Sequence, residues 1–242
     1  MNAIKKNQLK SRWIDNPPLK ADELLRQSNV VKQGLVMGMQ LAVLEEQTAA
    51  VVAEGRLVSV FLPGAYQLEK DKMPTLKPDK KYNWLYPAQL YFINMAKAPA
   101  EQWQPQEPLL TRDPERGLVQ LTLIGDYEAQ VEDVALFMQN MVLEQAIYDW
   151  PALHHYLNGR LNELAISLMA HNRTDINRLG KIKEKIALML QHQMSWDLRD
   201  SGLALRNLRI LTLEVHPQMR RLWQEQKDYL AFNRSLEHAI LD

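Results

Sequence analysis

The sequence QLAVLEEQTAAVVAEGRLVSVFLPGAYQL, residues 40–68, decides the fold of the N-terminal half of the chain. It reads as two strands that are joined by a glycine turn at residues 54–56 and closed by a second turn at residues 63–64. Apolar and β-branched runs that are bounded by glycine and proline are typical of strands and their turns. The stretch therefore predicts a β-rich N-terminal half.

Outward from this stretch, the pattern changes from strands to helices and back to one strand. We expect an arm at 1–20, a short helix at 21–28, linker-like loops at 69–88 and 95–117, and strands at 90–94 and 118–129. Three helices are predicted between residues 132 and 202, with Thr174 as the N-cap of the third. A strand at 203–215 and a helix that begins at Pro217 follow.

This order predicts an α+β fold, in which helices pack on an N-terminal antiparallel-rich sheet and the last strand returns to the sheet. We divide the chain into a basic arm with a short helix at 1–34, an α+β domain at 35–216 and a C-terminal amphipathic helix at 217–242.

Composition narrows the classes of function. The chain has 29 basic and 29 acidic residues, and this neutral balance argues against nucleic acid as the main partner. It has no cysteine, which excludes disulfides, thiol nucleophiles and thiolate metal ligands. No run approaches the roughly 20 apolar residues that span a bilayer, and the N-terminus has no apolar core of a secretory signal. We expect a cytoplasmic protein, or one peripheral to the inner face of the membrane.

The sequence offers few candidates for catalysis or metal binding. His154 and His155 are adjacent, so on a helix they point about 100° apart and do not share one site; we interpret both as surface residues. Carboxylate pairs such as Glu45 and Glu46 are interpreted as solvated charge. The nine glycines are spread singly and form no phosphate-binding loop. We therefore expect no enzyme activity, catalytic residue, cofactor or metal, and a hydrolase centred on the two histidines is the weaker alternative.

Two segments are candidate interaction surfaces. In the N-terminal arm, basic residues surround an interfacial aromatic residue: Lys5, Lys6, Lys10, Arg12 and Trp13. Each basic residue contributes about 1 kcal/mol of attraction to anionic lipid, and tryptophan favours the membrane interface. The arm therefore predicts weak contact with an anionic membrane. The alternative is a solvated arm or one that docks on a neighbouring subunit.

The last predicted helix carries a long apolar stripe. The candidate contact residues on it are Leu222, Trp223, Tyr229, Leu230 and Leu236. A stripe of this kind packs on its own domain or against another chain. Both alternatives stay open from the residues alone.

Five stretches, in this order, resemble the SPFH superfamily (stomatin, prohibitin, flotillin; band 7). They are residues 40–68, LYFIN at 90–94, Trp103 with Pro108-Leu109 and Arg112-Asp113-Pro114, Gly125-Asp126-Tyr127 with Phe137, and DSGLALRNLRILTLEV at 200–215. They are most similar to the bacterial virion core protein-like branch. The chain departs from the family pattern at Gln104, where the family has glycine. We also expect no N-terminal membrane hairpin, no long heptad helix after the domain, and no zinc module of the kind that some relatives carry.

The resemblance implies a non-enzymatic, self-assembling scaffold or adaptor that forms a homo-oligomer and organises unidentified protein partners at or near a membrane. Within the family, assembly runs through the helical region after the domain. The alternative is a soluble cytosolic protein-binding module that acts as a monomer or dimer.

Overall fold

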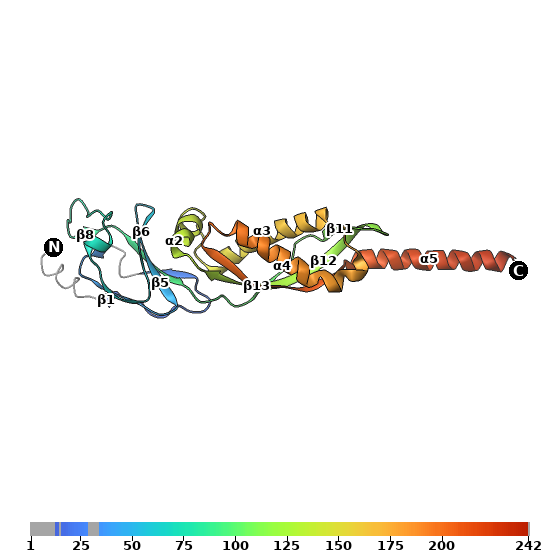
Figure 1. The fold of residues 1–242 in the computed structure, drawn as a ribbon, viewed down its shortest axis with the longest axis horizontal. Helices are drawn as coiled ribbons and strands as arrows, with labels where there is room; N and C mark the ends of the chain where they lie inside the picture. Colours follow the sequence, from blue (N-terminus) through green and yellow to red (C-terminus); the bar gives the residue numbers. More distant parts are fainter. Residues whose placement is uncertain (1–12, 15, 29–33, 242) are drawn as a thin grey trace. The chain divides into compact units, whose positions relative to one another are not determined.

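The computed structural model describes residues 13–14, 16–28 and 34–241, with side chains described up to Tyr229. The fold is α+β, as predicted from the sequence (Figure 1). The chain forms two compact units that interleave along the sequence. Unit 1 comprises Met1–Glu101, Glu128–Tyr156 and Ser195–Arg206, and unit 2 comprises Gln102–Tyr127, Leu157–Met194 and Asn207–Asp242.

The main sheet of unit 1 is built around β5 (Gln47–Ala53), which pairs antiparallel with β9 (Gln89–Asn94) and β6 (Arg56–Phe61). The apolar residues of β5 are buried, which explains why the strand is a continuous apolar run. Glu54 and Gly55 both have positive φ, 51° and 70°, as the two-residue turn of a twisted hairpin requires. The predicted glycine turn is therefore confirmed.

The stretch 40–68 holds four strands, although the sequence predicts two. β4 (Gln40–Val43) and β7 (Gly64–Gln67) lie in a second sheet with β1 (Trp13–Ile14), in the order β1-β4-β7. A turn closed by the Gln47 N–H and the Leu44 carbonyl, 3.2 Å apart, separates β4 from β5. Glu45 and Glu46 form this turn and are exposed, but a polar turn does not reveal that the strands on its two sides enter different sheets.

The predicted linker at 69–88 is anchored in the core of unit 1. It contains a 3-10 turn, η2 (Lys70–Lys72), and ends in β8 (Leu85–Tyr86), which pairs with β3 (Leu35–Val36). Met73 and Leu76 are 0% and 3% exposed, in one apolar cluster with residues of β4 and β5. The lysines and prolines of this segment are a solvated rim over two buried apolar side chains.

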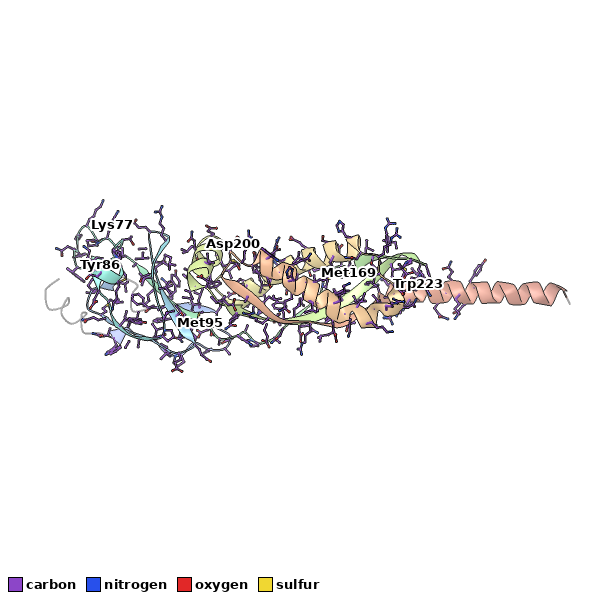
Figure 2. The ribbon with its side chains drawn as sticks, in the orientation of Figure 1. Lys77, Tyr86, Met95, Met169, Asp200 and Trp223 are labelled. Carbon is purple, nitrogen blue, oxygen red and sulfur yellow. The ribbon has the colours of Figure 1, made fainter. Side chains whose placement is uncertain are left out.

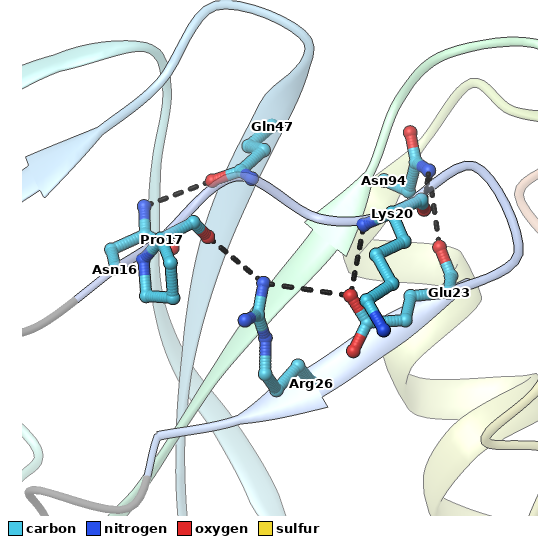
Figure 3. Close-up of polar contacts among 7 residues, drawn as sticks. All are labelled: Asn16, Pro17, Lys20, Glu23, Arg26, Gln47 and Asn94. Atoms are coloured by element: carbon cyan, nitrogen blue, oxygen red, sulfur yellow. Dashed lines mark hydrogen bonds and ion pairs between the residues drawn. The ribbon is translucent and has the colours of Figure 1, made fainter.

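The predicted helix at 21–28 is wrong, because residues Leu25–Gln27 form β2 on the edge of β9. Polar contacts tie residues 16–23, which precede β2, to strands β2, β5 and β9 (Figure 3). The Arg26 guanidinium donates to the Pro17 carbonyl at 2.9 Å, and the Asn94 amide donates to the Glu23 carbonyl at 3.0 Å. The free edge of β9 supplies hydrogen bonds that outweigh the weak local preference for helix.

The helical half starts close to its predicted position. Asp133 caps α2 (Val134–Leu136), and the chain continues as a π-helical segment, η3 (Phe137–Leu143). The long helices are α3 (Trp150–His171) and α4 (Leu179–Asp197). Thr174 is buried and is not the N-cap; the Asp175 carboxylate accepts from the Asn177 N–H at 2.9 Å and caps η4 (Ile176–Arg178), which leads into α4.

The longest strand, β12 (Gly117–Val131), joins β10 (Glu101–Trp103), β11 (Leu109–Asp113) and β13 (Leu203–Val215) into one sheet. Thus the predicted connection at 95–117 contains two strands. Hydrogen bonds from Glu132 N–H to Gly202 O, 2.9 Å, and from His216 N–H to Gln120 O, 2.8 Å, show that β13 runs antiparallel to β12. The last strand therefore returns to a sheet, but this is the sheet built on β12 and not the predicted N-terminal sheet. The long antiparallel partner β12 supplies the hydrogen bonds that pair with β13.

Helix α5 (Pro217–Leu241) follows β13 after a single residue. In Figure 1 it is the red helix that ends at the C-terminus, and no other described element lies alongside its C-terminal part.

Candidate interaction surface

The base of α5 is fixed to the rest of unit 2 by two arginines. The Arg116 guanidinium lies over the Trp223 ring, 4.5 Å from its centre. Arg220 donates through Nε to the Val215 carbonyl at 2.8 Å, and its guanidinium lies 2.5 Å from the Glu214 carboxylate. These contacts join the first two turns of α5 to the end of β13 and to the β11–β12 hairpin, and Figure 2 labels Trp223 at this point.

Asp113 positions Arg116 by shaping the hairpin turn. Its Oδ1 accepts from the Glu115 and Arg116 N–H groups at 2.9 and 2.8 Å, and its Oδ2 accepts from the Ile176 N–H at 3.0 Å. The bond from Ile176, followed by the two bonds in the turn, lowers the pKa of the Asp113 carboxyl against the opposing effect of burial. One carboxylate therefore connects the hairpin to the start of η4.

A shallow open pocket of about 360 Å³ lies at the same place in unit 2. It is lined by the hairpin, the start of α4 and the junction of β13 with α5: Arg116, Ile176, Leu179, Leu213, Arg220 and Trp223 are among its residues. Both guanidiniums that border it are already engaged, one by an aromatic ring and one by a carboxylate. The arrangement is suited to contact with another molecule's side chains, since it offers an indole and apolar groups with a charged rim.

Beyond its base, α5 exposes apolar side chains. Leu222 and Tyr229 are 60% and 65% exposed, whereas Trp223 is half-buried against Arg116. Of the predicted contact residues, two are therefore open to solvent and one is engaged by its own chain. The side chains of Leu230 and Leu236 lie outside the described part of the chain, and their role stays a prediction.

The N-terminal arm is described only at its end. Lys5, Lys6, Lys10 and Arg12 lie outside the described residues. Trp13 is 55% exposed, while its neighbour Ile14 is buried and pairs with Leu41 in a parallel bridge between β1 and β4. The predicted arm is therefore anchored to the sheet at residues 13–14, and its membrane contact stays a prediction.

The two adjacent histidines have different surroundings. His155 is exposed, as interpreted from the sequence, but His154 is half-buried and stacks on Trp150 with ring centres 5.8 Å apart. Burial lowers the pKa of His154, and the charge of Glu101 acts in the opposite direction. Within the described residues, no three His, Asp or Glu side chains come together as a set of metal ligands.

Comparison with known proteins identifies the class. The chain matches the family model of the SPFH domain-Band 7 family over residues 25–228. The chain therefore belongs to the SPFH/band 7 family, as its motifs suggest, and the match extends from β2 to the middle of α5. No curated protein sequence matches the chain. Placement in the virion core protein-like branch stays a prediction.

Membership of this family is consistent with a scaffold or adaptor role. No helix in the described part of the chain is long and apolar enough to cross a membrane.

The motif Arg112-Asp113-Pro114 shows what the sequence reading missed. In the sequence it is only a point of resemblance to the family, yet in the structure Asp113 organises the turn that places Arg116 on Trp223. An Asp followed by Pro and then by a glycine in a short loop is a turn signal that the sequence does contain. The partner ring lies 107 residues later, and no local pattern links the two.

Proposed function

We propose that this protein is a non-enzymatic scaffold or adaptor that assembles with itself, and that α5 carries the contact between copies. The observation that carries the proposal is the contrast along α5. Its first turns are held by Arg116 and Arg220, whereas Leu222 and Tyr229 stand open to solvent. A surface of this kind supports a contact with another chain.

The length of α5 supports the same conclusion. A helix of 25 residues extends about 37 Å, far beyond the contacts at its base. Helices in proteins gain most of their stability from packing of an apolar face, so a partner chain is a plain source of stability for the part of α5 beyond its base. Membership of the SPFH/band 7 family, whose members organise other proteins, supports the scaffold role.

The test is the mass of the native particle, measured by light scattering across micromolar concentrations. We expect a multimer for the natural chain, and a smaller particle for Leu222→Asp, because the new carboxylate is desolvated in the apolar contact. Arg221→Asp is the matched control, since it changes the neighbouring exposed position. A strict monomer for the natural chain at all concentrations contradicts the proposal and favours a monomeric protein-binding module.

A peripheral membrane contact is a second, separate part of the proposal. Trp13 stands 55% exposed at the end of the basic arm, while Ile14 anchors that end in the sheet. This arrangement supports presentation of the arm to an anionic surface, and the proposal is of a cytoplasmic protein that contacts the membrane only at its surface.

Flotation with anionic vesicles at low and high salt tests this contact. We expect recovery at low salt that is lost at high salt and lost in the variant Lys5/Lys6/Lys10/Arg12→Ala, because screening weakens surface charge attraction. Equal recovery of the natural chain and the variant contradicts the role of the arm.

A further inference from the structure

The pocket at the base of α5 has a largely apolar lining. Leu179 and Leu213 are buried there, 5% and 6% exposed, and Ile176 and Val215 are half-buried beside them. Its volume of about 360 Å³ lies near the lower end of the usual range for ligand pockets, about 300–1,000 Å³, and it is shallow and open to solvent. A hollow of this kind is better suited to one or two apolar side chains of another molecule than to an enclosed small ligand.

The chain around the pocket is basic, although the protein as a whole is neutral. The lining residues come from three segments of unit 2, residues 111–118, 171–183 and 213–223. These segments contain eight arginines and lysines against four aspartates and glutamates, whereas the whole chain has 29 of each. A locally concentrated positive field attracts negatively charged partners.

Two of these arginines lie side by side without a carboxylate. Arg112 of β11 and Arg173 face each other in a parallel β-bridge, in which the Thr174 N–H donates to the Arg112 carbonyl at 2.9 Å. Both arginines are exposed, and within the described residues neither has a carboxylate partner. Residues that face one another in a sheet project to the same side, where like charges repel each other. An anionic partner relieves this repulsion.

The arginine pair lies within reach of the pocket. Arg112 precedes the pocket residue Arg116 by four positions, and Arg173 precedes the pocket residue Ile176 by three. Because a chain extends at most about 3.6 Å per residue, the pair lies within about 14 Å of the pocket lining. An extended peptide of about four or five residues spans the same distance. One short segment of another protein can therefore reach both the pocket and the arginines.

We propose that this surface, the pocket together with Arg112 and Arg173, binds a short acidic peptide segment of a partner protein. One large apolar side chain of the segment enters the pocket, and its aspartates or glutamates meet the two arginines. Arginine forms paired hydrogen bonds with carboxylates, and a buried anchor at the centre of an interface carries much of its binding energy.

Nucleic acid fits this surface less well than an acidic peptide. Non-specific binding of single strands relies on open aromatic rings on which bases stack. The aromatic ring of the pocket lining is that of Trp223, and the Arg116 guanidinium already lies over its face. The apolar lining instead suits an aliphatic or aromatic side chain, which a peptide supplies.

The inference goes beyond the contact between copies. That contact is assigned to Leu222 and Tyr229 of α5, and neither residue lines the pocket. Peptide binding at the base of α5 therefore leaves self-assembly intact, and it defines the chemistry of a partner that an adaptor would recruit.

The probe is a library of random twelve-residue peptides displayed on phage and selected against the full chain. We expect the enriched peptides to be acidic and to carry a leucine, isoleucine or aromatic residue within about four positions of an aspartate or glutamate. The most enriched peptide is then labelled with fluorescein, and its dissociation constant is measured by fluorescence anisotropy. A selection that enriches no peptide, or peptides without acidic residues, overturns the proposal.

Two variants and a matched control identify the site. Arg112→Glu/Arg173→Glu is expected to raise the dissociation constant by about tenfold or more, because two attractive charge contacts become repulsive. Asn177→Trp, which fills the pocket from an exposed position of its lining, is expected to weaken binding to a similar extent. The control Lys185→Glu/Lys227→Glu makes the same change of net charge at exposed positions that do not line the pocket, and is expected to have less than about a threefold effect. Equal losses for the two double variants overturn the assignment of the site.

Two further measurements separate this inference from its alternatives. If single-stranded DNA or anionic vesicles bind more tightly than the enriched peptide, and this binding is lost in Arg112→Glu/Arg173→Glu, the arginines serve another anion and the peptide proposal is wrong. The particle mass of the same variant is expected to be unchanged by light scattering, so a failure of peptide binding leaves the self-assembling scaffold standing. A strict monomer that binds the peptide contradicts self-assembly alone.

Discussion

The segment 69–88 and helix α5 place their apolar residues in opposite environments. The irregular segment, rich in lysine and proline, buries Met73 and Leu76 almost completely. The regular helix leaves Leu222 and Tyr229 more than half exposed. The comparison teaches that regular secondary structure is no guide to burial within the chain. In the loop, apolar residues complete the core of unit 1, and on α5 they form a surface that we assign to a second copy.

The largest expected effect is on folding, through Met73→Ala. Removal of this fully buried side chain leaves a cavity and is expected to lower the free energy of unfolding by about 2–5 kcal/mol. Denaturant titration at several protein concentrations measures it, and the loss is expected to be the same at each. Leu222→Ala is the control, with a loss that grows with protein concentration, because it weakens association and not the fold. If instead the loss for Met73→Ala grows with protein concentration and the loss for Leu222→Ala does not, the assignment of Met73 to the core and Leu222 to an interface is wrong.

The next effect is on association, through Tyr229→Ala. Loss of a central aromatic residue from an interface typically costs about 2 kcal/mol, which is roughly a thirtyfold rise in the dissociation constant. Sedimentation velocity across a dilution series measures this constant. Tyr82→Ala, which removes a half-buried tyrosine from the segment 69–88, is expected to leave it unchanged. An equal rise in the dissociation constant for Tyr229→Ala and Tyr82→Ala contradicts the assignment of the contact to α5.

A pH effect is expected from Asp113. Its pKa is lowered in the folded chain below the ordinary value of 3.8, chiefly by the Ile176 N–H. A lowered pKa means that the charged form stabilises the fold above the unfolded pKa, and that this contribution is lost as pH falls through the folded pKa. Stability of the natural chain is therefore expected to fall more steeply below pH 4 than that of Asp113→Asn. Parallel curves for the two proteins contradict this role.

The smallest effect is expected at the base of α5. Arg116→Ala removes the cation over Trp223 and is expected to cost about 0.5–1 kcal/mol of unfolding free energy, the usual range for an exposed cation–π contact. Thermal unfolding followed by circular dichroism measures the change, and Lys181→Ala, an exposed change at the start of α4, is the control. An unchanged midpoint shows that the base of α5 is held by Arg220 alone.

Sequence reasoning located the regular elements well where hydrophobic pattern and turn chemistry agree. The turn at Glu54-Gly55 and the strands β9, β12 and β13 are found near their predicted positions. It was wrong at 21–28, where pairing with β9 creates a strand, and at Thr174, where Asp175 is the cap. At 21–28 the deciding neighbour, β9, is remote in the sequence. At Thr174 a competing cap, Asp175, lies one residue further along.

The candidate surface is likewise only partly predictable from the sequence. The apolar residues of α5 and their spacing are visible in the sequence, as is the basic arm. The sequence does not show which of the apolar residues of α5 are exposed, because their exposure depends on which face of the helix the rest of unit 2 covers. Trp223 and Leu222 are adjacent and both apolar, yet one lies against Arg116 and the other stands free.

The sequence by itself determined the α+β class and the apolar stripe of α5, because these follow from periods of two and 3.6 residues and from turn residues read locally. Its motifs, by their resemblance, also indicated the family. Only the tertiary structure decided that 40–68 divides between two sheets, that the segment 69–88 is anchored, and that Leu222 of α5 is exposed while Trp223 lies against Arg116. The physical reason is that burial and pairing are properties of residues brought together from distant parts of the chain. A local pattern states what a segment prefers, and its neighbours in space decide which preference is realised.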